Sequence, residues 1–399
     1  MDGWQVAPLS ELTQFINGLW KGEDPPFVHV GVIRNTNFTK DGDLDNSDIA
    51  YLDVEAKKFL KRRLQFGDLI LEKSGGGPKQ PVGRVVLFDK TEGDFSFSNF
   101  TAAIRVVNST ALDARFLHKY LHWVYVSGRT ETMQSHSTGI RNLNGDAYKA
   151  IKVAYPPLTE QRRIVAILDE AFEGIATAKA NADKNLQNAR ELFDNALQSL
   201  LHDSDGGRVR RSMADVCDIP SKLVDPREEK YQDSPHVGAG NIETKTGALI
   251  DVLTARQEQL ISGKFLFDES MVLYSKIRPY LMKVVRPDFN GLCSADIYPL
   301  APKYGVIGRD YLFYLLLSPD FTAYAIKGSA RAGMPKVNRE HLFAYEFSLP
   351  SVQEQEQIAA RLDALAEETQ RLIAVYERKL AALEELKKSL LHQAFSGQL

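Results

Sequence analysis

Cysteine is scarce in this sequence, which has only Cys217 and Cys293 among 399 residues. Two thiols are too few for a disulfide framework or a thiolate metal site, and they suit a reducing compartment. Long apolar runs are also missing, because none approaches the ~20 residues needed to cross a bilayer. The N-terminus, Met1–Trp4, lacks the basic start and apolar core of a signal peptide. We therefore expect a cytoplasmic protein without a membrane segment.

Two further absences concern function. The formal net charge is −3, so any binding of nucleic acid must rest on local basic patches. The sequence contains no His-Glu-x-x-His, no Gly-x-Ser-x-Gly and no Cys/His cluster, and it therefore supports no catalytic centre. What is present, 44% hydrophobic and 25% charged residues over 399 positions, is typical of a globular protein of two to three domains.

One passage of the sequence occurs twice. Pro156-Pro-Leu-Thr-Glu-Gln-Arg-Arg-Ile164 returns as Pro350-Ser-Val-Gln-Glu-Gln-Glu-Gln-Ile358, and each copy continues as Ile-x-x-x-Leu-Asp. Both copies lead to a second shared motif, Ser-Leu-Leu-His, at Ser199–His202 and Ser389–His392. Each copy also follows a globular stretch of comparable length. The chain is therefore an internal duplication of a globular part and a helical part.

Each repeated passage opens a long amphipathic helix. Thr159 is a good N-cap for the first helix, whereas Gln353 is a poor one for the second. Apolar residues follow three-, four- and seven-residue steps, as in a coiled coil with slips in phase. Matched beginnings and ends make two helices of about 40 residues, or ~60 Å, a natural antiparallel pair. The alternative is two unrelated helices, each packed on its own domain.

The globular stretches, 4–155 and roughly 208–349, have mixed α and β patterns without regular βαβ alternation. Glycine and polar residues predict loops at 74–81 and 139–144. The first stretch is predicted to contain strands at 27–33, 67–71, 82–88 and 151–155 and a helix at 115–125. The fold class we expect is α+β: two tandem mixed α/β domains separated by two long helices. These helices form an antiparallel coiled coil with pseudo-two-fold symmetry. Such a protein can present two heads to one regular ligand, and duplex DNA is the obvious candidate.

Three motifs admit a catalytic or ligand-binding interpretation. Asp24-Pro-Pro-Phe27 resembles the loop with which amino-methyltransferases hold a target base, but too few residues precede it for a cofactor-binding unit. The run Gly75–Lys79 lacks the Gly-Lys-Ser/Thr ending of a phosphate loop. His118 and His122 have the spacing of a metal pair, but no third ligand is evident. We expect a turn, a flexible ligand-contacting loop and a structural pair, respectively.

Basic residues gather at two places in the second stretch. Pro279 ends a strand predicted at 271–274 and crowds basic and aromatic side chains around the turn Ser275–Lys283. Arg331, Lys336 and Arg339 form another cluster, and its counterpart in the first stretch is Arg141-Asn142. Arginine can bond guanine bidentately, lysine can meet phosphates, and tyrosine can stack. A solvated turn without a ligand is the alternative.

Taken together, these motifs resemble the DNA-specificity subunit of type I restriction–modification systems. The resemblance covers essentially the whole chain. It rests on both copies of Pro-x-x-x-Glu-Gln-x-x-Ile-x-x-x-Leu-Asp, on Tyr274–Leu281, on Cys293–Leu300, and on the terminal Gln393–Gly397. It implies target-recognition domains at 1–157 and 207–350, with helical spacer regions at 158–206 and 351–399. Each domain would read one half of an asymmetric bipartite site, and the helices would set the gap.

The resemblance also implies partners and assigns the catalysis to them. Two modification subunits would bind S-adenosylmethionine and methylate adenine. Restriction subunits would use ATP and Mg to translocate and cleave double-stranded DNA. This chain would be non-catalytic and would carry no cofactor. The first domain departs from the Lys-Ile-Arg-Pro-Tyr-Leu pattern, so the two halves should read different sequences.

The candidate contact residues follow from these clusters and from the resemblance. The expected DNA contacts are Lys73, Lys79, Gln80, Arg84, Arg141, Asn142, Lys276, Arg278, Tyr280, Lys283, Arg331 and Lys336. The expected partner contacts on the helices are Glu160, Gln161, Ile164, Leu168, Glu354, Gln355, Ile358 and Leu362. Three other functions stay open: a specificity subunit of a fused methyltransferase–nuclease, a methyltransferase that uses the Asp24 motif, and a coiled-coil scaffold without DNA binding.

Overall fold

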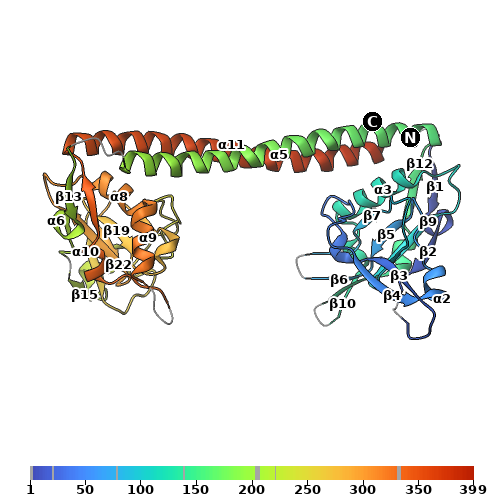
Figure 1. Ribbon diagram of the computed structural model, residues 1–399, viewed down its shortest axis with the longest axis horizontal. Helices are drawn as coiled ribbons and strands as arrows, with labels where there is room; N and C mark the ends of the chain where they lie inside the picture. The colour runs from blue at the N-terminus through green and yellow to red at the C-terminus, as the bar shows by residue number, and fades with distance from the viewer. Residues whose placement is uncertain are drawn as a thin grey trace. The chain divides into compact units, whose positions relative to one another are not determined.

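The computed structural model describes residues 3–19, 22–77, 80–137, 140–202, 207–220, 222–329 and 334–399. The chain forms two compact units. Unit 1 contains Met1–Asp183 and Arg378–Leu399, and unit 2 contains Lys184–Glu377. Each unit combines a β-rich body with parts of two long helices, α5 (Leu158–His202) and α11 (Val352–Ser396) (Figure 1). None of the helices in the described ranges is long and apolar enough to cross a membrane.

The body of unit 1 is built around an antiparallel four-stranded sheet. Its strand order is β2 (Thr13–Asn17), β9 (Thr101–Val106), β5 (Leu69–Glu72) and β7 (Val85–Leu87). All four residues of β5 are buried, because the sheet is covered on both faces. Leu69 and Leu71 pack with helix α3 (Ala114–Val126), whereas Ile70 faces a second sheet.

Two smaller sheets complete the body of unit 1. In one, β3 (Phe27–Ile33) lies between antiparallel β4 (Ala50–Glu55) and parallel β8 (Phe95–Phe97). The other has the order β10 (Gln134–Ser137), β11 (Ile140–Leu143), β6 (Ser74–Gly76). The sequence predicted loops at 74–81 and 139–144. This prediction is wrong for Ser74–Gly76 and Ile140–Leu143, which form strands β6 and β11. Their pairing, which aligns Asn142 with Ser74, is a long-range contact that local composition does not report.

Unit 2 has the same layers. Its four-stranded sheet has the order β14 (Cys217–Asp218), β22 (Ile297–Pro302), β19 (Val272–Ser275), β20 (Val284–Val285). Val272 and Tyr274 of β19 face helix α8 (Arg309–Leu317). Leu273 faces the other way, toward a five-stranded sheet. That sheet has the order β15 (Leu223–Val224), β18 (Lys264–Phe267), β21 (Gly291–Cys293), β16 (Pro235–Val237), β17 (Leu253–Thr254).

The correspondence between the units extends to their short elements. A parallel strand pair occurs in each outer layer, β3 with β8 and β16 with β21. Two-stranded ribbons join β1 (Gln5–Pro8) to β12 (Lys152–Tyr155) and β13 (Val209–Ser212) to β23 (Glu346–Leu349). The other short helices are α1 (Leu9–Leu12), α2 (Ala56–Leu60), α4 (Gly145–Lys149), α6 (Met213–Val216), α7 (Glu229–Gln232), α9 (Pro319–Lys327) and α10 (Arg339–Phe343). Single 3-10 turns lie at Asn35–Asn37, Glu131–Met133 and Pro279–Leu281.

In both units the two long helices run antiparallel. In unit 1, Ile164 and Leu168 of α5 share a core with Leu391 and Phe395 of α11, and further along Lys179 pairs with Glu384 at 2.6 Å. Unit 2 repeats the arrangement, because Leu197 of α5 packs with Ile358 and Leu362 of α11, while Arg190 lies 3.7 Å from Glu377. The pairing expected from the repeated motifs is therefore present within each unit.

The helix ends differ from prediction in detail. The first helix begins at Leu158, so Thr159 lies inside it and is not its N-cap. At the second helix, the hydroxyl of Ser351 accepts a hydrogen bond from the Glu354 N–H at 3.3 Å and takes the role that Gln353 could not. The second helix also continues past His392 to Ser396.

Candidate nucleic-acid interface

The predicted contact segments occupy equivalent places in the two units. In each unit, a first contact segment follows the buried strand of the four-stranded sheet, β5 or β19. It pairs with a second segment, which precedes a short helix near the end of the body, α4 or α10. In unit 1 this pairing aligns Ser74 with Asn142. In unit 2 it is an isolated bridge between Ile277 and Lys336. The fold thus brings together cations that are distant in sequence, on the same type of surface in both units.

The turn after β19 is held in an unusual backbone conformation. Arg278 and Met282 have φ angles of 51° and 49°, in the left-handed region that a residue with a side chain occupies at a cost of about 1–3 kcal/mol. The Arg278 N–H donates to the Pro335 carbonyl at 2.9 Å, which ties the turn to the neighbouring segment. Arg278 and Tyr280 are exposed, and within the described ranges the Arg278 guanidinium has no partner. It is therefore available to a ligand.

Lys276 and Lys336 flank a carboxylate. Lys336 Nζ lies 2.8 Å from Asp296 Oδ1, and Lys276 Nζ lies 3.7 Å from the same oxygen. Lys276 also donates to the Ala295 carbonyl and lies over the Tyr298 ring. Burial, with a further contribution from Lys336, lowers the pKa of Lys276, and the hydrogen bond from Lys336 lowers the pKa of Asp296. Lys276 is thus mostly engaged inside the unit, while Lys336 is half-exposed.

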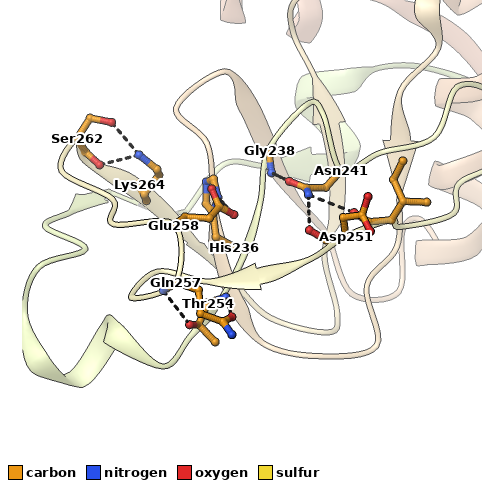
Figure 2. Close-up of polar contacts among 10 residues, drawn as sticks. His236, Gly238, Asn241, Asp251, Thr254, Gln257, Glu258, Ser262 and Lys264 are labelled. Carbon is orange, nitrogen blue, oxygen red and sulfur yellow. Dashed lines mark hydrogen bonds and ion pairs between the residues drawn. The ribbon is translucent and has the colours of Figure 1, made fainter.

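Lys283 connects this turn to the loop after β16. Its ammonium group donates to the Ala239 carbonyl at 2.6 Å. Figure 2 shows the Asn241 side chain bridging that loop: its Oδ1 accepts from the Gly238 N–H at 2.8 Å, and its Nδ2 donates to the Asp251 carbonyl at 3.0 Å. The neighbouring His236 is buried, with Nδ1 at 3.1 Å from both Glu258 carboxylate oxygens. These contacts make the loop a support for the turn, which the sequence alone did not indicate.

In unit 1 several of the corresponding side chains form hydrogen bonds within the unit. Lys73 Nζ donates to Asn17 Oδ1 at 3.0 Å, and burial lowers the pKa of Lys73. The Ser74 hydroxyl donates to Asn142 Oδ1 at 2.6 Å. Arg141 donates to Gln134 Oε1 at 3.4 Å, and Gln80 is exposed. Two predicted contacts, Lys79 in this unit and Arg331 in unit 2, lie outside the described residues.

Arg84 has an internal role. Its guanidinium donates to both Glu72 carboxylate oxygens at 2.8 Å and to the Phe38 carbonyl at 2.8 Å, and only 9% of the residue is exposed. Burial opposes its charge, but the pairing with Glu72 prevails and raises the pKa of Arg84 above its ordinary value. A bidentate pair of this kind holds the guanidinium away from any ligand.

The glutamines of the repeated Glu-Gln step are also internal. Gln161 and Gln355 are 0% and 1% exposed. Ile164, Leu168, Ile358 and Leu362, the apolar residues of the same predicted partner surface, are buried in the cores. Glu160 and Glu354 are partly exposed and pair with Arg163 at 2.7 Å and Arg208 at 2.9 Å, respectively. Of the eight residues predicted there, only the two glutamates reach the surface to a substantial degree.

The Asp24 motif and the pair His118 and His122 lie in the body of unit 1. Residues 23–25 are a bend that leads into β3. His118 Nε2 donates to the Gly42 carbonyl at 2.9 Å, and burial lowers the pKa of His118 to about 4 and that of His122 to about 3. The described part of the chain contains no group of three or more side chains suited to a metal. His118 and His122 are both buried, and the hydrogen bond of His118 joins helix α3 to the Gly42 turn.

The chain is similar to a known protein family over most of its length. The family model for the type I restriction modification DNA specificity domain matches residues 1–186 and 209–382. The specificity subunit of type I restriction enzyme EcoDI from Escherichia coli is 34% identical over 184 residues, which are 46% of this chain. The chain spans only 40% of the length of that relative. The StySPI specificity subunit from Salmonella potsdam is 20% identical over 100% of this chain and 89% of its own.

Solved structures share the fold. A chain from a structure concerned with complex assembly and conformational transition of the type I R-M system superposes with a TM-score of 0.78, over 100% of this chain and 99% of that chain. The HsdS subunit from Thermoanaerobacter tengcongensis gives a TM-score of 0.63, over 100% and 98%. Both are 17% identical in sequence, a level at which the likeness concerns the fold alone.

Proposed function

Because the chain belongs to the family defined by the type I restriction modification DNA specificity domain, we propose that it is the sequence-recognition subunit of a type I restriction–modification complex. Each target-recognition domain, at 1–157 and 207–350, reads one half of an asymmetric bipartite DNA site. The helical regions at 158–206 and 351–399 set the gap between the halves and dock two modification subunits.

One observation carries this proposal beyond family membership. Both units gather their candidate contacts on the same topological surface, after β5 in one and after β19 in the other, where a second segment pairs with it. A duplicated surface suits a ligand that offers two similar grooves in succession, as a DNA duplex does. The residues on the two surfaces differ, which suits two unlike half-sites.

We take the exposed members of the predicted set, together with three half-buried ones (Lys336, Arg141 and Asn142), as the preferred DNA contacts. In unit 2 these are Arg278, Tyr280 and Lys336, with Arg278 as the base reader because its guanidinium can bond guanine bidentately. In unit 1 they are Gln80, Arg141 and Asn142. Lys73, Lys276 and Lys283 are bonded within their units and contribute by position and charge. Lys79 and Arg331 complete the proposed set.

We propose that catalysis belongs to the partners. The modification subunits supply S-adenosylmethionine, and the restriction subunits supply ATP and Mg, while this chain reads DNA in the cytoplasm without a cofactor of its own. Glu160 and Glu354, at the beginnings of the long helices, are the side chains of the predicted partner surface that a docked subunit can reach. The modest net charge of −3 fits a reader whose partners help hold the duplex.

The decisive experiment is to determine the motif methylated in cells that carry this chain with its modification subunits. The expected result is one bipartite motif with two unlike ends and an unspecified gap. Methylation of a continuous motif would contradict recognition by two separate domains. Methylation that does not depend on this chain would contradict its role in recognition. Purifying the complex distinguishes separate partner subunits from a fused methyltransferase–nuclease.

A further inference from the structure

A carboxylate, that of Asp296, lies between two of the lysines predicted to contact DNA in unit 2, Lys276 and Lys336. Asp296 is half-exposed and precedes β22, on a segment separate from the turn at 276–283 and from the segment at 334–337. Its Oδ1 meets Lys336 Nζ at 2.8 Å and Lys276 Nζ at 3.7 Å. A negative charge at this place works against binding of any polyanion, so its presence in a DNA-reading surface requires a reason.

The surrounding backbone supplies that reason. The Lys276 N–H donates to the Asp296 carbonyl at 3.0 Å, and the Val337 N–H donates to the Lys276 carbonyl at 2.8 Å. The Tyr298 hydroxyl, on the strand that Asp296 precedes, donates to the Val337 carbonyl at 3.1 Å. Three segments therefore meet at Asp296, and its carboxylate is the group that compensates the two ammonium charges brought together there.

Arg278 depends on this meeting point. Its left-handed backbone is held by the bond to Pro335, the residue directly before Lys336. Without a compensating charge, Lys276 and Lys336 repel each other across the Ile277–Lys336 bridge. Displacing Lys336 then displaces Pro335, and with it the base of the Arg278 side chain.

We propose that Asp296 is a positioning residue for sequence recognition in unit 2: it holds Lys276 and Lys336 together and thereby sets the place of Arg278. This rests on the proposed DNA-reading function. The Asp296 carboxylate would thus increase the preference for the cognate site, although its negative charge lowers the affinity for DNA in general. Simple electrostatics predicts that removing the carboxylate strengthens binding to all DNA, whereas positioning predicts weaker binding to the cognate site alone.

The test is Asp296→Asn in the complex with modification subunits, with Kd measured on cognate and on random duplexes at one salt concentration. Positioning predicts that the ratio of random to cognate Kd falls at least about tenfold, while binding to random DNA is unchanged or tighter. Asp296→Glu should restore part of the ratio. Asp288→Asn, which removes an equal charge from an exposed loop of the same unit, is the matched control and should leave the ratio unchanged.

The proposal would be overturned by an unchanged ratio of the two Kd values in Asp296→Asn, including the case in which affinity rises equally on both duplexes. Should that variant fail to fold, Asp296→Ser removes the same charge with a smaller polar side chain and leaves both lysines in place. Positioning then predicts a fall in the ratio, and equal changes in Kd on both duplexes contradict it. A wild-type complex that does not discriminate cognate from random DNA would instead overturn the proposed function itself.

Discussion

The side-chain carbonyl of Gln161 accepts a hydrogen bond of 2.8 Å from the backbone N–H of Asp113. Its amide nitrogen donates to the Ala111 and Pro156 carbonyls, both at 2.8 Å. Gln355 repeats the arrangement in unit 2, where it accepts from the Gly308 N–H at 2.8 Å and donates to the Val306 and Pro350 carbonyls at 3.0 and 2.9 Å. One buried amide therefore joins the beginning of each long helix to the loop before α3 or α8.

Replacing Gln161 with Ala should destabilise unit 1 by about 1–3 kcal/mol, because it leaves a buried N–H and two carbonyls without their partner. All three tryptophans, at positions 4, 20 and 123, belong to unit 1, so tryptophan fluorescence during denaturant unfolding reports that unit. Gln355→Ala is the matched control and should leave the tryptophan transition unchanged. Equal midpoints for wild type and Gln161→Ala would contradict the role of the amide.

The sequence identified the repeated Glu-Gln step but not the direction in which its side chains point. A glutamine in the first turn of a helix can point toward a partner or toward its own domain. For Gln161, the position of the loop before α3 determines that the side chain points toward its own domain. The mixed α and β character of each domain was predictable because segments such as the strand predicted at 67–71 carry dense apolar residues. Strand β6 was missed because its Ser-Gly-Gly sequence has no β propensity, and pairing with β11 overrides it.

Phe395, near the C-terminal end of α11, packs against helix α3. Its ring lies 5.4, 5.2 and 5.6 Å from those of Phe116, Tyr120 and Trp123 on α3, and the residue is 2% exposed. Phe395→Ala should therefore destabilise unit 1 by about 3–5 kcal/mol, although Phe395 follows Asp183, the end of the first segment of that unit, by more than 200 positions. Leu386→Ala, at an exposed site on the same helix, should change stability by less than about 0.5 kcal/mol.

The same fluorescence assay checks this prediction. Because Trp123 touches Phe395, the emission of the folded protein should also change in the variant. An unfolding midpoint within error of the wild type would show that the last residues are not part of the core of unit 1.

The buried pair His118 and His122 should make unit 1 sensitive to acid. Burial lowers the pKa of His118 to about 4 and that of His122 to about 3, below the ordinary value of 6.5. At pH values between 6.5 and these lowered pKa values, the unfolded chain therefore binds more protons than the folded one. Stability is therefore complete above about pH 6.5 and is lost as pH falls toward 4, at about 1.4 kcal/mol for each unit by which a pKa is displaced.

Denaturant midpoints from tryptophan fluorescence at pH 7.5 and 5 measure this loss. His122→Gln cannot take up the proton and should reduce the difference between the two midpoints. His29→Gln, which replaces an exposed histidine of the same unit, should not. A wild-type midpoint that is independent of pH across this range would contradict the assignment.

Arg278→Ala should weaken binding of the complex to its cognate site by about 1–3 kcal/mol, since the exposed guanidinium is the proposed base reader. Binding to random DNA should change much less. Arg211→Ala removes an exposed arginine of the same unit away from the turn and serves as the control. Kd values on both duplexes decide: an equal loss on cognate and random DNA would make Arg278 a phosphate contact.

The proposed spacer role of the helices gives the last prediction. α5 passes from unit 1 to unit 2 between Asp183 and Lys184, and α11 passes back between Glu377 and Arg378. A seven-residue insertion at both places keeps the apolar seams in phase, because seven residues complete two turns of a coiled coil. It adds roughly 10 Å to each helix, or about three base pairs of duplex.

The methylated motif of the inserted variant should therefore keep both ends and gain about three base pairs in its gap. A two-residue insertion at both places is the informative control, since it rotates each apolar seam by about 200° to the opposite face and should abolish methylation rather than lengthen the gap. If the seven-residue variant methylates the original motif, the helices do not set the spacing, and the gap must be determined by the partner subunits.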